Sequence, residues 1–196
     1  MARPREFDED EAIKGAMSVF WQLGYDGASM PDLLAGMNLT RGSLYKAFND
    51  KKSLFLIALK RYEREAVGPA VTLLTDTRIK DGAQRIAALF ETILDAVRQG
   101  DRRGCMLCSA AAGPAAYDDD IAHDVHQLIS QMQQAFTRSL EASPAHRHLT
   151  ATEREHLAAS LTTQYAGLRT LARSRTPLSM LAQSVAGLSA QLRSGQ

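Results

Sequence analysis

Apolar residues recur at every third or fourth position through most of the chain, which is the spacing of one face of an α-helix. Near the start, this face consists of Ile13, Ala16, Met17, Phe20 and Leu23. Asp8 precedes this face and is followed by three more acids. Acidic side chains at these positions stabilise the unpaired amides of a first helical turn. We therefore expect a first helix that begins after Asp8 and ends at Gly24.

Two shorter apolar periods follow, each preceded by a side chain that can cap a helix. Ser29 stands before the first period and Thr40 before the second. Within the second period, Leu44 and Phe48 are four residues apart, so both are expected to face the core. After a polar break, Asp50 can cap a longer helix that begins at the next residue.

The rest of the chain predicts mostly longer helices. We expect one over about 83–99 and another over about 118–140, with a short apolar segment between them at 105–113. Thr152 and Glu155 match a capping box ahead of a further helix. The last segment has apolar residues separated alternately by three and four positions, a seam that favours a helical partner. No segment has the period of a strand, so the expected fold class is all-α.

Length and composition are those of a globular protein. The chain has 196 residues, of which 45% are hydrophobic and 23% charged, enough for one large domain or two small ones. We divide it into a small bundle over 1–50 and a larger part over 51–196, bridged by the helix that begins at about residue 51. The sequence has no run of about 18 apolar residues and no apolar signal segment at its start, so we expect a cytoplasmic protein without a membrane partner.

Positive charge is concentrated in one stretch of the chain. The net charge is only +1, but residues 40–64 contain seven bases and two acids. Such a stripe attracts polyanions even on a nearly neutral chain. A solvated helix face would show the same charges, so charge alone does not decide between the two interpretations.

The order of elements at the start of the chain is that of a helix-turn-helix, in which the second short helix enters a major groove. Arg41 and Ser43 can donate hydrogen bonds to base edges, and Gly42 permits close backbone approach. Tyr45 and Lys46 point away from the buried face and can reach phosphate oxygens. An ordinary helical bundle without a nucleic-acid role remains the alternative.

Residues 7–62, and especially the pieces GYDGASM, GSLYKAF and DKKSLF, resemble the DNA-binding domain of the TetR family of bacterial transcriptional regulators. The resemblance implies an N-terminal three-helix, helix-turn-helix DNA-binding bundle and a larger C-terminal helical domain for ligand binding and dimerisation. It also implies a homodimeric repressor that binds a palindromic double-stranded DNA operator and is released by a small-molecule effector.

The resemblance also assigns residues to the DNA. Ser29 and Met30 are expected at the backbone, and Lys51 at a phosphate beside a helix N-terminus. The second short helix is expected to supply the other contacts, through Thr40, Arg41, Gly42, Ser43, Tyr45 and Lys46. Lys46-Ala47 departs from the family, which commonly has an aromatic or histidine pair there. Arg3 and Arg5 resemble the basic arm of many members.

The C-terminal part resembles the family in architecture alone. In the family, the last two helices pair across a dimer, so the apolar stripes of these helices are expected to form that surface. The stripes consist of Leu157, Leu161, Leu168, Leu178, Leu181, Val185, Leu188 and Leu192. Burial within a single chain is the alternative.

Ligands of the family bind among the middle helices. The residues that we expect to line such a pocket are Phe90, Ile93, Leu94, Cys105, Leu107, Cys108, Met132, Phe136 and Tyr165. These residues are nearly devoid of charge, so they indicate an apolar or aromatic effector. Ordinary core packing is the alternative for each of them.

The two cysteines allow a different switch. RRGCMLCSAAAG resembles a segment in which a Gly-Cys pair opens a helix near the pocket, and members with this pair include sensors of electrophiles or oxidants. Neighbouring arginines and a helix N-terminus would make the thiol of Cys105 more reactive, and Cys108 is close in sequence. A buried cysteine that only packs is the alternative. His123 and His126 follow at nearly a zinc-site spacing, but without the surrounding finger pattern we expect no metal and no cofactor.

Motifs of common enzyme classes are missing from the sequence. It contains no G-x-S-x-G, no H-E-x-x-H and no glycine-rich phosphate loop. We therefore expect no catalytic residues. A helical adaptor without a DNA role is the alternative from a different class.

Overall fold

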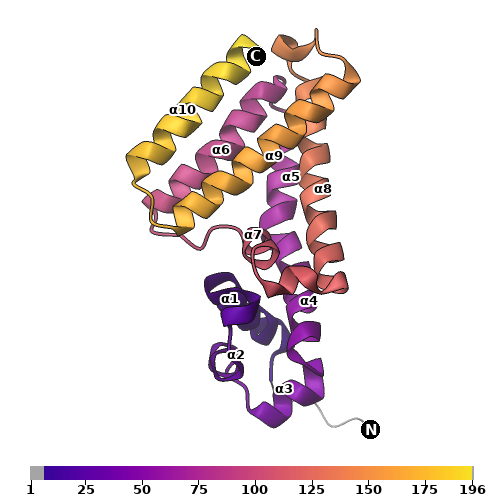
Figure 1. Ribbon diagram of the computed structural model, residues 1–196, viewed down its shortest axis with the longest axis vertical. Helices are drawn as coiled ribbons and strands as arrows, with labels where there is room; N and C mark the ends of the chain where they lie inside the picture. Colours follow the sequence, from indigo (N-terminus) through magenta and orange to yellow (C-terminus); the bar gives the residue numbers. More distant parts are fainter. Residues whose placement is uncertain (1–6, 196) are drawn as a thin grey trace. The chain divides into compact units, whose positions relative to one another are not determined.

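The computed structural model describes residues 7–195, and within this range every regular element is a helix (Figure 1). The all-α prediction is confirmed. The chain forms two compact units: residues up to Glu65 with Met106–Val125, and Ala66–Cys105 with the residues from His126 on. None of the described helices is long and apolar enough to cross a membrane. Arg3 and Arg5 lie outside the described residues.

The first unit is built around one long helix. Helix α1 packs against α2, α4, α7 and η2, and α3 packs against α4. The bounds of these elements are α1 (Glu9–Gly27), α2 (Met30–Met37), α3 (Arg41–Phe48), α4 (Lys51–Tyr62), α7 (Met106–Ala111) and the 3₁₀-helix η2 (Pro114–Tyr117).

Side-chain caps fix the starts of these helices. The Asp8 carboxylate accepts hydrogen bonds from the amides of Asp10 and Glu11, at 2.9 and 3.3 Å. Asp50 accepts a bond from the Ser53 amide at the start of α4, at 2.7 Å. Both predicted caps are confirmed. Gly24 interrupts α1 as expected, with φ 76° and ψ 169°, but a further helical turn extends the element to Gly27.

Close contact between α1 and α2 depends on glycine. A Cβ built on Gly15 would lie 2.1 Å from the carbonyl oxygen of Gly36, and a Cβ on Gly36 would lie 2.4 Å from a methyl carbon of Val19. Neither distance is compatible with a side chain, so the two helices approach to backbone contact. Aromatic rings complete the core of the unit: Phe20 meets Phe55 edge-on at 4.9 Å between ring centroids.

Residues 106–125 belong to the first unit although they come more than forty residues after α4. The Asp26 carboxylate, at the end of α1, accepts a hydrogen bond from the amide of Ala115 in η2, at 3.4 Å. The unit therefore contains more than the expected 1–50 bundle, because α4 and this later segment both bury residues against α1. Such long-range packing leaves no signal in local composition.

The second unit is arranged around α6. Helix α6 packs against α5, α9 and α10, and α9 also packs against α10 (Figure 1). The bounds are α5 (Gly68–Leu74), α6 (Gly82–Arg98), η3 (Pro144–His146), α9 (Ala151–Arg173) and α10 (Leu178–Ser194). The π-helix η1 (Glu63–Val67) and α8 (Asp119–Glu141) each contribute residues to both units. The helices predicted over 83–99 and 118–140 are thus confirmed to within two residues.

The predicted capping box of α9 is wrong by two residues. The box is formed by Thr150 and Glu153 instead of Thr152 and Glu155: the Thr150 amide donates to the Glu153 carboxylate at 2.7 Å, and the Glu153 amide donates to the Thr150 hydroxyl at 3.3 Å. Both pairs satisfy the sequence pattern, and only the position of the preceding loop decides between them.

Most residues of the apolar stripes on α9 and α10 are buried by other parts of the same chain. Six of the eight residues expected at a partner surface are buried in the single chain: Leu161, Leu168, Leu181, Val185, Leu188 and Leu192. Leu157 and Leu178 are half-buried. The physical reason is that α10 packs against α6 of the same chain. The exposed faces of α9 and α10 are therefore formed by other residues.

Candidate functional site

Helix α3 has a buried side and a polar exposed side. Leu44 is 0% exposed and Phe48 2%, so these two residues fix the helix against the rest of the unit. Arg41 and Lys46 are exposed, and Tyr45 is 44% exposed. The predicted division of this helix into a packing face and an outward face is thus present.

The exposed side of α3 carries hydrogen-bond donors without an acid. The helix reads RGSLYKAF, and the Arg41 guanidinium lies 5.9 Å from the centroid of the Tyr45 ring, in cation–π range. A Cβ built on Gly42 would have nothing within 4 Å. A partner backbone can therefore approach α3 closely at Gly42, between donors that suit phosphates and base edges.

Both short helices start with a capped turn. The Thr40 hydroxyl accepts a hydrogen bond from the Ser43 amide at 3.3 Å and lies 2.9 Å from the Ser43 hydroxyl. At α2, the Ser29 amide donates to the Asp32 carboxylate at 2.9 Å, and the Ser29 hydroxyl accepts from the Asp32 amide at 3.2 Å. Asn38 has φ 52°, which reverses the chain between the two helices. These local bonds hold the turn in one geometry.

Two neighbouring lysines at the start of α4 have different surroundings. The Lys51 ammonium lies 4.7 Å from the centroid of the Tyr25 ring, and burial lowers its pKa. The Lys52 ammonium contacts Asp118 at 2.9 Å and Asp120 at 2.6 Å, and hydrogen bonds to these carboxylates raise its pKa. Lys52 therefore ties α4 to the start of α8 within the first unit.

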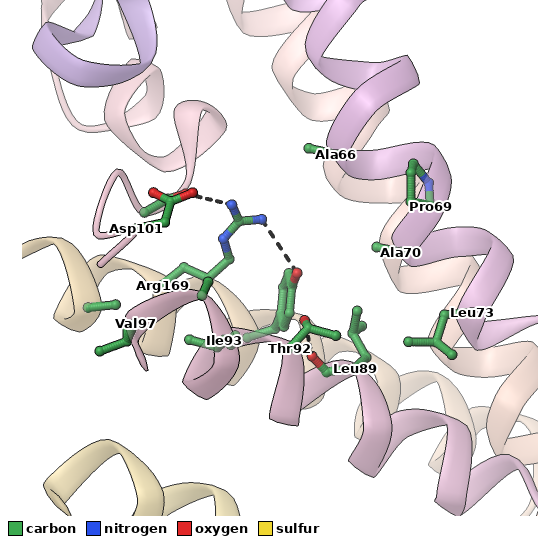
Figure 2. Close-up of a pocket in the computed structure, with 14 residues that line it drawn as sticks. Ala66, Pro69, Ala70, Leu73, Leu89, Thr92, Ile93, Val97, Asp101 and Arg169 are labelled. Carbon is green, nitrogen blue, oxygen red and sulfur yellow. Dashed lines mark hydrogen bonds between the residues drawn. The ribbon is translucent and has the colours of Figure 1, made fainter. Parts of the chain in front are cut away.

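The second unit contains a cavity of about 360 Å³ (Figure 2). Most of its wall is apolar and comes from α5 and α6, for example Leu73, Leu89 and Ile93. At one end lie Asp101, from the loop after α6, and Arg169, from α9; Figure 2 shows their charged groups pointing toward each other. The wall therefore combines a long apolar part with a charged end.

Only Ile93 and Tyr165, of the nine residues expected at a pocket, line this cavity. Phe90 and Phe136 are fully buried behind Tyr165, with ring centroids 5.6 and 6.3 Å from the Tyr165 ring. Leu94 and Met132 are buried without lining the cavity.

The remaining pocket predictions fall in or next to α7. Leu107 and Cys108 belong to the first unit, outside the cavity wall. Cys105 is buried and follows Gly104, which lines the cavity with φ 73°. Sequence reasoning missed Arg169 and Asp101. The position of Arg169 four residues after Tyr165, on the same helix face, was the available signal.

Arg169 is held in place by neighbouring groups. Its guanidinium donates to the carbonyl oxygen of Gly104 and to the Tyr165 hydroxyl, the latter at 3.4 Å. The guanidinium carbon lies 5.6 Å from the centroid of the Tyr165 ring. Asp101 accepts hydrogen bonds from Arg103 at 2.7 and 3.0 Å, and these bonds, with the nearby charge of Arg169, lower the pKa of the Asp101 carboxyl. The charged end thus carries ionised groups of both signs.

Other reactive groups do not gather into a site. Among residues 7–195, no three or more His, Cys, Asp or Glu side chains form a group that could hold a metal ion. The acids at 118–120 begin α8: Asp118 accepts hydrogen bonds from the amides of Asp120 and Ile121, at 3.1 and 3.3 Å. This confirms the expectation that these acids mark a helix start.

Comparison with known proteins places these features in a family. The model of bacterial regulatory proteins of the tetR family matches residues 12–58, which include α2, α3 and most of α1 and α4. The uncharacterized HTH-type transcriptional regulator YezE of Bacillus subtilis (strain 168) is 30% identical over 142 residues, covering 71% of this chain and 72% of that protein. The HTH-type transcriptional repressor ComR of Escherichia coli (strain K12) is 29% identical over 198 residues, covering 97% and 90%.

Solved structures extend the similarity to the whole chain. The TetR family transcriptional regulator CifR, solved as a double cysteine mutant with a 26-base-pair operator DNA, has 30% identity and a TM-score of 0.83 over 99% of this chain and 100% of that one. The reduced form of E. coli NemR shares the fold, with 19% identity and a TM-score of 0.78 over 91% and 93%. The chain belongs to the TetR family of bacterial transcriptional regulators.

Proposed function

We propose that the protein is a homodimeric repressor that binds a palindromic operator through α3 and is released by a small molecule bound in the cavity of the second unit. The observation that carries the DNA-binding part is the exposed side of α3, where Arg41, Tyr45 and Lys46 surround an open glycine and no acid is present. Such a surface suits the edges of bases and the phosphates on both sides of a major groove.

Each α3 residue then has a role that follows from its position. Arg41 and Ser43, in the first turn, donate to base edges, and Gly42 lets the groove floor approach the helix backbone. Tyr45 and Lys46, one turn later, donate to phosphate oxygens. Thr40, Ser29 and Met30 stand at the amino ends of α3 and α2, where the positive end of the helix dipole favours a phosphate. Lys51 adds a positive charge at the start of α4.

The names of the relatives support a DNA-binding repressor. CifR was solved with operator DNA, and ComR is named a transcriptional repressor. Both relatives resemble this chain over nearly its full length, which supports the same mode of action for this protein.

The homodimer is supported by one stretch of exposed residues on α9 and one on α10, neither of which contains a charged side chain. Between Leu157 and Ala172, the exposed residues are Ser160, Thr163, Gln164, Gly167, Thr170 and Leu171. On α10, the exposed residues before Leu192 are Ser179, Met180, Gln183, Ser184, Ala186, Gly187, Ala190 and Gln191. Exposed helical faces normally carry charges, and the centres of protein interfaces are depleted of them.

Two glycines in these faces favour a close partner. A Cβ built on Gly167 or Gly187 would have nothing within 4 Å, so the chain's own packing does not require glycine there. Glycine inside a helix costs about 0.8–1.0 kcal/mol relative to alanine. Contact with the helices of a second copy would explain why these two positions are glycine, because glycine permits helices to approach closely.

A dimer also explains how an effector could release the protein from DNA. Two α3 helices enter successive major grooves only when they are about 34–36 Å apart. An effector that binds more tightly to a conformation with another spacing lowers operator affinity by the ratio of its affinities for the two conformations.

A thiol switch at Cys105 is the second candidate. Cys105 follows the cavity residue Gly104, and two of the similar solved structures are a cysteine mutant of CifR and a reduced form of NemR. An electrophile that enters the cavity would then modify Cys105, and Cys108, three residues further along the chain, would be the second thiol of the same switch.

Replacement of Gly42 by leucine tests the DNA-binding surface. We expect G42L to lower affinity for operator DNA at least about tenfold, because a bulky side chain would separate α3 from the groove. The free energy of unfolding should stay the same or rise by up to about 1 kcal/mol, since leucine favours helix more than glycine does. Fluorescence anisotropy with DNA from upstream of the gene and urea unfolding give the two values.

Ala111→Leu is the matched control, because it adds the same side chain at an exposed position of α7. This variant should bind DNA like the wild-type protein. Wild-type affinity in G42L would contradict the assignment of α3 to the groove.

Replacement of Gly187 by leucine tests the dimer face. We expect G187L to raise the dimer dissociation constant at least about tenfold while helix content stays unchanged, because the new side chain would meet only the partner. Analytical ultracentrifugation measures the constant, and Gln127→Leu, at an exposed position of α8, is the control. A dimer of unchanged affinity in G187L would exclude this face.

The thiol switch is tested by alkylation. If Cys105 is the sensor, N-ethylmaleimide releases the wild-type protein from operator DNA and leaves Cys105→Ser bound, whereas Cys108→Ser responds more weakly or normally. Anisotropy before and after treatment, with mass spectrometry of the adducts, distinguishes these cases. Release of Cys105→Ser to the wild-type extent would contradict the assignment of Cys105 as the sensor.

A further inference from the structure

The cavity of the second unit has a long apolar part of limited size. Its volume of about 360 Å³ is at the lower end of the range of roughly 300–1,000 Å³ found for small-molecule sites. Leu73, Leu89 and Ile93 supply branched aliphatic side chains from two helices, α5 and α6. This part suits a compact hydrocarbon or aromatic body and offers it little besides apolar contact.

The other end of the cavity lies in a surplus of positive charge. Four arginines gather at the loop over 101–104: two belong to the loop, and two from α9, Arg169 and Arg173, donate to its carbonyl oxygens. Asp101 is the acid of this loop. Arg102 donates to the carbonyl oxygens of Ala172 and Thr176, at 3.3 and 3.1 Å, and Arg173 donates to that of Arg103, at 2.9 Å. The acceptors in these three bonds are backbone carbonyl oxygens, which carry no formal charge.

The Asp101 carboxylate lies between two arginines: it is bonded to Arg103, two residues after it, and it faces the guanidinium of Arg169 (Figure 2). The Asp101 oxygens accept from the amide and Nε of Arg103, both at 3.0 Å, and from its Nη2 at 2.7 Å. The loop and its arginines thus bring four positive charges and one negative charge to a cavity with an apolar wall. An anion placed there would be stabilised by these charges more strongly than in water, because the apolar surroundings screen charges weakly.

Arg169 is the member of the cluster that lines the cavity. Its position is fixed before any ligand binds, because the Tyr165 ring lies beneath the guanidinium and the Gly104 carbonyl accepts from it. Tyr165 in turn packs edge-on against Phe90, with ring planes at 80°. A preorganised guanidinium loses little side-chain entropy when it pairs with a carboxylate.

We propose that this cavity binds a small organic carboxylate, with its apolar body between α5 and α6 and its carboxylate at Arg169. The inference rests on the proposed function in that this molecule would be the effector of the repressor. It replaces the purely apolar effector that the sequence favoured, because the expected residues did not include a charged wall.

Isothermal titration calorimetry of the full-length protein without DNA tests the ligand class. The probes are 1-naphthaleneacetate, 4-phenylbutyrate and octanoate, each with its neutral primary amide. We expect at least one acid to bind about tenfold or more tightly than its amide, as a charge-assisted pair with arginine predicts. Absence of binding by every acid at millimolar concentration, or equal affinity of acid and amide, would overturn the proposal on wild-type protein alone.

Variants then locate the contact. Arg169→Met should abolish the preference for acid over amide, and Arg98→Met, whose guanidinium pairs with the exposed Asp95 at 2.7 Å outside the cavity wall, should keep it. An unchanged preference in Arg169→Met would contradict the assignment. Thermal unfolding checks that both variants fold, and Arg169→Lys, which keeps the charge without the planar fork, should show an intermediate preference.

Operator binding is measured separately, so that the two proposals fail in different ways. An acid that binds in the calorimeter and leaves operator affinity unchanged would contradict its role as effector and retain the carboxylate site. A protein that binds no DNA would remove the proposed function, and the calorimetric comparison of acid and amide would stand unaffected.

Discussion

The burial of Leu44 and Phe48 is the constraint on which the DNA-binding surface depends. Because both side chains are almost completely inaccessible, α3 can rotate neither way about its axis without exposing them. At about 25 cal/mol for each Å² of apolar surface, that exposure would cost several kcal/mol. The rotation of α3 in turn determines that Arg41, Tyr45 and Lys46 face outward together. The caps at Thr40 and Asp50 then fix where α3 and the following helix begin.

Local chemistry made this surface predictable from the sequence. Caps, the i, i+4 apolar pair and the glycine in α3 all act over a few residues, so their spacing gives the helix boundaries and the outward side chains directly. The same holds for the long helices α6 and α8, whose periodic apolar faces placed them within about two residues. The all-α class followed from these patterns without reference to distant contacts.

The second unit was less predictable, because its features depend on contacts between distant segments. An apolar stripe such as that of α10 needs a helical partner, but the stripe is the same whether the partner is α6 of the same chain or a second copy. Similarly, Phe90, Phe136 and Tyr165 form one aromatic cluster, and only the tertiary packing decides that Tyr165 alone reaches the cavity. From the sequence alone, Arg169 is expected to be a surface residue, since arginine is usually exposed.

The most direct test of the DNA-binding account is the salt dependence of operator affinity for the wild-type protein and Lys46→Ala. Fluorescence anisotropy with upstream intergenic DNA, and with a random sequence of equal length, gives both affinities at several salt concentrations. The account predicts saturable, sequence-preferring binding whose logarithm falls linearly with the logarithm of salt concentration, with a slope smaller by about one in the variant. Equal affinity for both DNAs, or a slope unchanged by the loss of Lys46, would contradict it.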